Sequence, residues 1–250
     1  MSLSQEQIES YARDGYLPAI DVVGAEQATD YRRQFDELEA EVGREKAGIG
    51  LIDLHFQRRF IWDIAVNPVV LDAIEALLGP NILLLASHFF CKYGPDKEKF
   101  VAWHQDVTFW GLEPPKAITA WFAVDDSDAG NGCMQVIPAT QLGGILQHGK
   151  ADQAGNLLSI NQEVMISDEQ RQGAVDLPLR AGQMSLHSGT LIHGSLSNMS
   201  TRRRCGLTLR YVPTSVRQTK DNSHGGSWNA LLVRGEDREQ NFGLRTIPFA

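Results

Sequence analysis

The sequence predicts a mainly β fold with flanking helices, and two observations lead to this prediction. In about the first 80 residues, apolar side chains recur every three or four positions, as in amphipathic helices. From about residue 82 to 213, short apolar and aromatic runs alternate with Gly, Pro, Asn and Asp, as in strands. Consecutive strands after a helical segment favour a double-sheet jelly roll over alternating β and α units. We therefore expect one domain over residues 1–250, with helices in about 1–80 packing on a β core in about 82–213.

The first helices are predicted by their end signals and their spacing. Ser4 with Gln7 matches a capping box, and Asp14-Gly15 ends the helix that follows. A short strand is expected from Tyr16 to Ile20. A second helix is expected because its apolar residues step by three or four, at Ala28, Tyr31, Phe35, Leu38 and Val42.

A glycine-bearing loop and a third helix complete the N-terminal part. Residues 43–50 begin and end with glycine and are expected to form a loop. Asn67 is a suitable N-cap and Pro68 a suitable first helical residue, while Gly79-Pro80 ends the apolar pattern. We expect a helix between residues 67 and 79.

The β-rich part contains short segments bounded by turn residues. One pair, residues 118–124 and 133–137, is joined by the turn-rich stretch DDSDAGNG and is expected to form a hairpin. The expected strands lie within residues 82–94, 117–126, 131–140, 176–189, 190–196 and 204–215. Residues 149–170 have no clear period and are expected to loop over one end of the core.

Composition limits the classes of partner. The net charge of −8 and the pI near 5.4 argue against nucleic-acid or anionic-membrane surfaces, and the basic run 202–204 is too short to change this.

The cysteines indicate a reducing compartment. Cys91, Cys133 and Cys205 lie in apolar segments without paired spacing, as buried thiols of a reducing cytoplasm do. Neither a signal peptide nor an apolar run long enough to cross a bilayer is recognisable. We expect a cytoplasmic protein with a small-molecule partner, and nothing in the pattern predicts an oligomeric state.

A metal-binding pattern lies at His104 and Asp106. In an extended segment, positions i and i+2 project to the same side, so these side chains can converge while Gln105 faces away. One such triplet is common by chance. However, His187 and His193 lie downstream, and two imidazoles with one carboxylate form the facial triad that holds non-haem Fe(II) with open positions.

The residues after His193 favour it over His187 as the third ligand. Strand parity puts Arg204, Gly206, Thr208 and Arg210 on one face of the following segment. Buried arginines need anions, and a guanidinium binds a carboxylate with two parallel hydrogen bonds. Metal, open positions and a carboxylate-binding arginine make a chemically coherent set.

The chain resembles the phytanoyl-CoA dioxygenase family in several motifs that occur together. The opening S-x-E-Q-I-x-x-Y-x-R-D-G-Y-L and the helix VVLDAIEALLGP are also similar, so the resemblance runs nearly end to end. The motifs are W-H-Q-D at 103–106, A-W-F-A-V-D-D at 120–126, N-G-C-M-Q-V-I-P at 131–138, L-I-H-G-S at 191–195 and R-R at 203–204 before LRYVP. The resemblance implies a double-stranded β-helix, which is a cupin-like jelly roll, and a dioxygenase that uses Fe(II), 2-oxoglutarate and O2.

The resemblance also implies the roles of individual residues. His104, Asp106 and His193 correspond to the iron ligands. Arg204 corresponds to the residue that binds the distal carboxylate of 2-oxoglutarate. Ser195 matches a position that hydrogen-bonds the same carboxylate, and Trp121 matches an aromatic residue beside the cosubstrate.

The acidic ligand bears on the reaction that the resemblance implies. A halogenating branch of these enzymes replaces it with Ala or Gly, whereas this chain keeps Asp106. The expected reaction is therefore hydroxylation of an unactivated C–H bond with release of succinate and CO2. Desaturation, cyclisation and epimerisation use the same cofactors and stay open. A non-catalytic jelly-roll binding or sensing protein is the alternative from another class.

Other residues have two readings each. Lys92 is expected either to bind a carboxylate of the substrate or cosubstrate, or to extend to the surface. Trp110 is expected either to line the active site or to pack in the core. Arg210 is expected either to bind a substrate anion or to form a structural ion pair. His187 is expected to support the ligands rather than bind metal. Asp125-Asp126 is expected to form a turn rather than a metal dyad. The spacing gives no role to His55, His88, His148 or His224.

The expected substrate is a small organic acid, amino acid or secondary metabolite. A CoA thioester needs basic residues for its phosphates, and no such patch is recognisable in the sequence. We expect the substrate pocket to be built from residues 55–62, the loop after Gly149 and the tail after Thr214.

Overall fold

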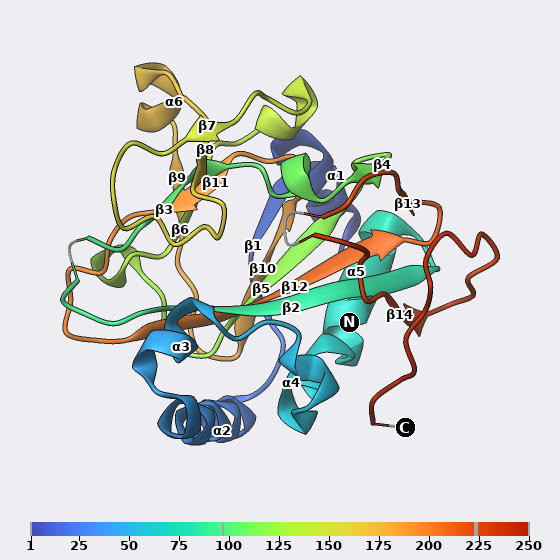
Figure 1. Cartoon of the computed structure of the whole chain (residues 1–250), viewed down its shortest axis with the longest axis horizontal. Helices are drawn as coiled ribbons and strands as arrows, with labels where there is room; N and C mark the ends of the chain where they lie inside the picture. Colours follow the sequence, from blue (N-terminus) through green and yellow to red (C-terminus); the bar gives the residue numbers. More distant parts are fainter. Residues whose placement is uncertain (1, 97, 223–224, 250) are drawn as a thin grey trace.

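The core of the protein consists of two antiparallel sheets with helices packed outside (Figure 1). The computed structural model describes residues 2–96, 98–222 and 225–249. The six-stranded sheet has the order β1 (Tyr16–Asp21), β10 (Gln183–Ser188), β5 (Ile118–Ala123), β12 (Arg204–Pro213), β2 (Ile82–Lys92) and β14 (Leu231–Arg234). The four-stranded sheet has the order β3 (Val101–His104), β11 (His193–Ser195), β6 (Met134–Val136) and β9 (Val175–Leu177). This arrangement confirms the predicted mainly β, jelly-roll core with flanking helices.

The helices with clear end signals form where they were predicted. In α1 (Gln5–Asp14) the Ser4 and Gln7 side chains make both bonds of the capping box, and Gly15 ends the helix in the left-handed region. In α2 (Ala25–Val42) the predicted apolar face is buried except at Val42, which is partly buried. Before α5 (Pro68–Leu78) the Asn67 side chain accepts a hydrogen bond from the Val69 amide. These signals are local, so the sequence alone reveals them.

Three helices were not predicted, and one of them, α6 (Asp168–Gln172), begins within residues 149–170, which were expected to form a loop. Residues 43–50, expected to be a loop, contain α3 (Arg44–Ile49), in which Ala47 is fully buried. The Arg-Glu-Lys-Ala run has good helix propensity, and packing of the segment on β2 offsets the cost of Gly48. The helix α4 (Arg59–Ala65) lacks a side-chain cap, and five of its seven residues are apolar and buried, so no amphipathic period marks it.

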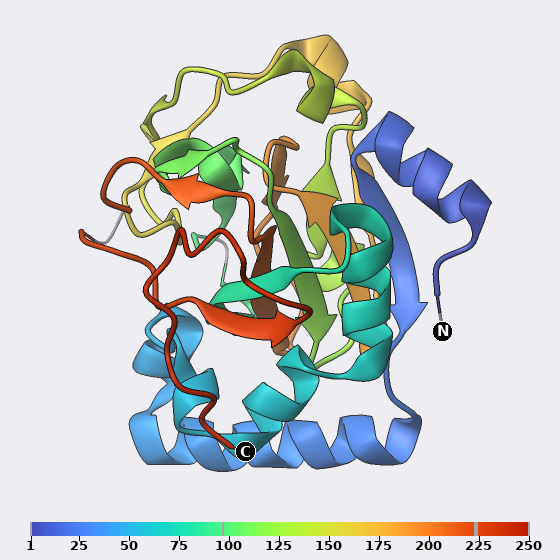
Figure 2. The same ribbon diagram turned by 90° about the vertical axis from the view of Figure 1, so that its right-hand side faces the viewer.

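Helices α2, α4 and α5 cover the outer face of the six-stranded sheet, and α3 packs on β2. Figure 2 shows α2 along the lower edge of the molecule and the yellow-green to yellow segments at the opposite end. On β12, Cys205, Leu207, Leu209 and Tyr211 belong to the main core with residues of α2, α4 and α5. The Tyr211 hydroxyl donates a 2.8 Å hydrogen bond to the Ala65 carbonyl. The predicted alternation of β12 is confirmed. Its other face, which carries Arg204, Gly206, Thr208 and Arg210, is therefore directed toward the second sheet.

The predicted hairpin between residues 118–124 and 133–137 is wrong. The strand β5 pairs with β10 and β12 in the larger sheet, whereas β6 pairs with β11 and β9 in the smaller one. The connecting segment crosses from one sheet to the other through a 3-10 turn, η3 (Ala129–Asn131). Turn-forming residues predict a change of direction, but they do not specify which strands then pair.

Shorter elements lie around the two sheets. Cys91, Cys133 and Cys205 are free and buried. None of the helices among the described residues combines the length and the apolar composition needed to cross a bilayer. The short elements are β4 (Leu112–Glu113), which pairs with β13 (Arg217–Gln218), β7 (Gly149–Lys150), which pairs with β8 (Gln162–Glu163), η1 (Leu54–Phe56), η2 (Asp106–Phe109), η4 (Thr140–Gly143) and α6 (Asp168–Gln172).

Candidate metal centre

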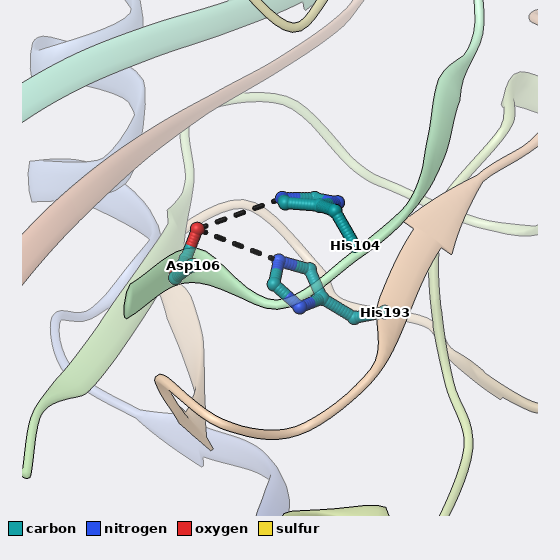
Figure 3. Close-up of side chains that lie close together, drawn as sticks. All are labelled: His104, Asp106 and His193. Atoms are coloured by element: carbon teal, nitrogen blue, oxygen red, sulfur yellow. Dashed lines mark ion pairs between the residues drawn. The ribbon is translucent and has the colours of Figure 1, made fainter. Parts of the chain in front are cut away.

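Three side chains from different elements converge at the inner end of the smaller sheet (Figure 3). His104 is the last residue of β3, His193 is the first of β11, and the two are register partners. Oδ1 of Asp106 lies 3.5 Å from His104 Nε2 and 3.9 Å from His193 Nε2. One potential ligand atom from each residue lies within 4.8 Å of the others.

The local structure that delivers Asp106 differs from the prediction. The chain is extended only through Gln105, and Asp106 begins η2 rather than continuing the strand. The Gln105 side chain is buried, and its amide donates hydrogen bonds to the carbonyls of Gly144 and Thr190. This buried anchor fixes the turn that brings Asp106 toward His104.

The hydrogen bonds of the two imidazoles orient them for metal binding. His104 Nδ1 lies 2.9 Å from the Ala102 carbonyl, and His193 Nδ1 lies 3.1 Å from the Leu191 carbonyl. A carbonyl only accepts hydrogen bonds, so each Nδ1 carries a proton, and Nε2 is the atom of each ring that is directed toward Asp106. This is the tautomer that a metal-ligating histidine requires.

The second oxygen of Asp106 is also fixed. Its Oδ2 accepts a 2.7 Å hydrogen bond from the Thr119 hydroxyl of β5, which leaves Oδ1 facing the imidazoles. Burial by itself raises the pKa of Asp106, but the neighbouring His193 and the contact with His104 outweigh it and hold the pKa well below its usual value. Burial holds the pKa of His193 well below its usual value. A neutral imidazole and a carboxylate are the protonation states that bind metal.

His187 lies beside these three residues. Its Nε2 is 3.4 Å from Asp106 Oδ2, which is an electrostatic contact rather than a well-formed hydrogen bond, and its ring centroid is 4.3 Å from that of His193. It is absent from the group of converging ligand atoms found among the described residues. Support of Asp106 and His193, rather than ligation, stays the prediction for this residue.

Two buried cations lie at one end of the pocket. Arg204 donates to the Gly132 carbonyl at 2.9 Å and to Ser195 Oγ at 3.1 Å, and its guanidinium lies 5.4 Å from the Trp121 ring centroid. Lys92, fully buried on β2, donates to Ser195 Oγ at 2.5 Å and to the Leu196 carbonyl. Lys92 therefore does not extend to the surface.

The charge of this pair is uncompensated. Within the described part of the chain, no carboxylate lies within 4.0 Å of Lys92 or Arg204. Burial lowers the pKa of both groups, that of Lys92 well below its usual value. Ser195 Oγ accepts from both cations, so its own proton is available to a further acceptor. The arrangement is suited to a bound anion.

The pocket around these groups has an empty volume of about 790 Å³, including the part open to solvent. It connects the histidines and Asp106 with Arg204 at one end and Arg210 at the other. Its lining is formed by His88, Phe90, Val101, His104, Asp106, Trp110, Thr119, Trp121, Met134, Leu158, Ser159, Gln162, His187, His193, Gly194, Ser195, Arg204, Thr208 and Arg210.

The pocket partly matches the segments that were expected to build it. Leu158, Ser159 and Gln162 come from the loop after Gly149, as predicted. Among the described residues, none from 55–62 and none after Thr214 contributes to the lining, so this part of the expectation is wrong. Thr119 was missed, because a threonine within an apolar strand is equally typical of ordinary β structure.

Trp110 lines the pocket as well as packing in the core. Its ring makes an edge contact with Trp228 at 5.6 Å, and the Trp228 indole donates to the Trp110 carbonyl. The Arg210 guanidinium also lies over the Trp110 ring, 4.8 Å from its centroid, and both residues line the pocket. Arg210 therefore faces the pocket, and it forms no ion pair within 4.0 Å among the described residues.

The remaining histidines have different settings. His88 lines the pocket and contacts the Ile49 carbonyl, whereas His55 is buried in the core beside Ser87. His148 Nε2 accepts a hydrogen bond from the backbone amide of Gln105, which lies between His104 and Asp106 in the sequence. His224 lies outside the described residues.

Asp125 lies in a bend after β5, and Asp126 follows it. Asp125 makes ion pairs with Arg203 at 2.7 Å and Arg32 at 3.1 Å. Asp126 accepts a hydrogen bond from the Ala181 amide.

Comparisons with known proteins agree with this geometry. A family model described as phytanoyl-CoA dioxygenase matches residues 11–206. Peroxisomal phytanoyl-CoA dioxygenase of Rattus norvegicus is 24% identical over 232 residues, which is 84% of this chain and 68% of the relative. L-proline trans-4-hydroxylase of Streptomyces griseoviridis is 26% identical over 84% of this chain and 88% of the relative. Among solved structures, the apo non-heme monooxygenase ThoJ aligns with a TM-score of 0.79 and 28% identity, covering 98% of this chain and 89% of that one.

Proposed function

This chain belongs to the phytanoyl-CoA dioxygenase family, and we propose that it is an Fe(II)- and 2-oxoglutarate-dependent dioxygenase that hydroxylates a small molecule. One observation carries this proposal. Two imidazole nitrogens and one carboxylate oxygen converge within 4.8 Å at the floor of a pocket whose end holds two buried cations without an acidic partner among the described residues. The first group suits the metal, and the second suits the cosubstrate.

The residues fit a divalent iron ion. His104, Asp106 and His193 supply nitrogen and oxygen donors, and three protein ligands leave coordination positions open. The bonds from the His104 and His193 Nδ1 atoms to carbonyls and from Thr119 to Asp106 fix the three donors before metal binds. Because the chain provides this support, little rearrangement is needed for binding.

The cationic end fits a dicarboxylate. With its 2-oxo acid end at the metal, 2-oxoglutarate would direct its distal carboxylate toward Arg204. Ser195 offers its hydroxyl proton to the same group, and Lys92 adds a second positive charge. Trp121 packs against Arg204 and would separate the cosubstrate from the core. This assignment places one negative charge beside Arg204 and Lys92, for which the described residues supply no carboxylate within 4.0 Å.

Iron with 2-oxoglutarate and O2 supplies the chemistry that converts a C–H bond to C–OH, with succinate and CO2 as coproducts. The chain binds the reactants, orients them and excludes water from the floor of the pocket. Retention of Asp106 supports hydroxylation over halogenation. Desaturation, cyclisation and epimerisation would use the same residues, and analysis of the product distinguishes them. Three free, buried cysteines support a reducing compartment such as the cytoplasm.

Succinate formation tests the proposal. Protein loaded with Fe(II) should convert 2-oxoglutarate to succinate under air, and candidate substrates should accelerate this conversion. Asp106→Ala or His193→Ala should reduce turnover by at least about 100-fold, because even residues that only support metal ligands contribute 10- to 100-fold. Asp21→Ala is a matched control, since its side chain is 77% exposed on β1. Undiminished turnover in either ligand variant would refute the proposal.

A further inference from the structure

Arg210 lies on the same face of β12 as Arg204, at the other end of the pocket. The two residues are six positions apart, which is roughly 20 Å along a strand. Arg210 is a register partner of Thr119, the residue that holds the Asp106 carboxylate. Arg210 therefore lies beside the residue that holds Asp106, whereas Arg204, which we assign to the cosubstrate, lies six positions away along the strand.

The charge of Arg210 is unpaired within the described residues. Its Nε is buried without a hydrogen-bond partner, and no carboxylate lies within 4.0 Å of its guanidinium. Asp106 and Asp53 act on it only as more distant charges. By comparison, Arg203, which immediately precedes β12, forms ion pairs with Asp125, Asp36 and Glu39.

Such an arrangement is costly unless a ligand completes it. A buried charge without a partner loses solvation that the protein does not replace. The Trp110 ring holds the guanidinium by a cation-π contact at 4.8 Å, so the side chain is positioned even in the absence of an anion. The guanidinium is thus fixed, oriented and without a counter-charge, next to the reacting position.

The rest of the lining limits the chemistry of the anion. Asp106 is the one acidic residue among the lining residues that the structure describes. The Thr208 and Thr119 hydroxyls beside Arg210 already donate, to the His88 carbonyl and to Asp106 respectively. A phosphate dianion needs several donors, whereas a single planar guanidinium matches one carboxylate.

We infer that Arg210 binds a carboxylate of the substrate, so the substrate is a small free carboxylic or amino acid whose oxidised carbon lies near His104, Asp106 and His193. This inference rests on the proposed function and adds the substrate class to it. Trp110, which lines the pocket and lies against the Arg210 guanidinium, provides apolar surface for the carbon skeleton at this end. Neutral esters, amides and thioesters lack the charge that Arg210 requires.

Matched acid and amide probes test the inference. The probes are the proteinogenic L-amino acids and short aliphatic carboxylic acids, each beside its primary amide, added to protein loaded with Fe(II) and 2-oxoglutarate. At least one acid should accelerate succinate formation. Its amide should be about 10- to 100-fold less effective, as expected for loss of a hydrogen-bonded charge pair.

Variants of Arg210 assign the preference to this side chain. Arg210→Gln should raise the KM for the active acid about 10- to 100-fold and abolish its advantage over the amide. Arg210→Lys should restore part of the preference, because it retains the charge but not the planar geometry. The same substitution at Arg180, whose side chain is 78% exposed, is the control and should behave as wild type. A merely structural role would lower activity without changing the ratio of acid to amide.

The outcomes separate this inference from the proposed function. Failure of Fe(II) and 2-oxoglutarate to bind to wild type contradicts the proposed function itself. When both bind, the carboxylate inference is overturned by any of three results: amides as effective as acids, an acid preference that survives in Arg210→Gln, or no response to any acid.

Discussion

The buried His55 should make the protein sensitive to acid. It lies in η1 with its side chain fully buried, its Nδ1 2.7 Å from Ser87 Oγ, and its Nε2 without a hydrogen-bond partner among the described residues. Burial lowers its pKa from 6.5 to about 4. The native state therefore keeps the imidazole neutral where the unfolded chain protonates it.

The size of the effect follows from this pKa difference. Below pH 6.5 the unfolded state binds one more proton than the native state, so the free energy of unfolding falls as the pH falls. Each pH unit costs about 1.4 kcal/mol, and the loss reaches about 3 kcal/mol near pH 4, where native His55 begins to protonate. Above pH 6.5 the contribution is constant.

Urea unfolding of wild type and His55→Gln protein measures this loss. The difference between their free energies of unfolding should change by about 3 kcal/mol, in favour of the variant, between about pH 7.5 and pH 4. Contributions from other groups, including His193, cancel in the difference. Ser87→Ala is the control, because it removes the hydrogen bond but leaves the buried imidazole, so it should keep the wild-type pH dependence. Parallel wild-type and His55→Gln curves would refute the reasoning.

Two further predictions concern the support of the site. Gly206→Ala should lower the free energy of unfolding measured in urea by about 1–3 kcal/mol and weaken 2-oxoglutarate binding. The reason is that a Cβ atom at this position would lie 1.9 Å from the Trp121 ring, which packs on Arg204. Unchanged stability and binding would contradict this prediction. Thr119→Val keeps the shape but removes the hydrogen bond to Asp106, so anaerobic titration should show about 10- to 100-fold weaker Fe(II) binding. Wild-type affinity in this variant would show that Thr119 does not support the ligand.

Local signals made much of the fold predictable from sequence. The Ser4 capping box and the Asn67-Pro68 start act through neighbouring residues, and the alternation along β12 needs only strand geometry. The wrong hairpin between residues 118–124 and 133–137 depended on pairing between distant segments, which turn residues do not encode. Helix α3 was missed because packing of Ala47 on the sheet, a tertiary effect, outweighs its glycines.

The candidate site shows the same division. Residue types and the family resemblance identified His104, Asp106 and His193 as a group before any geometry was available. Their orientation could not be predicted, because it depends on the carbonyls of Ala102 and Leu191 and on other bonds from elsewhere in the fold. The unpaired state of Arg210 was equally invisible, since only the folded chain shows which carboxylates come near it.

Anaerobic titration of the protein with Fe(II) and then 2-oxoglutarate tests the central claim most directly. The visible charge-transfer absorption of an iron–2-oxoglutarate complex should appear in wild type and saturate at one equivalent of iron. It should be lost in Asp106→Ala and His193→Ala, and Arg204→Gln should need a higher concentration of 2-oxoglutarate. Absence of the band in folded wild-type protein, or an unchanged band in the ligand variants, would contradict the account.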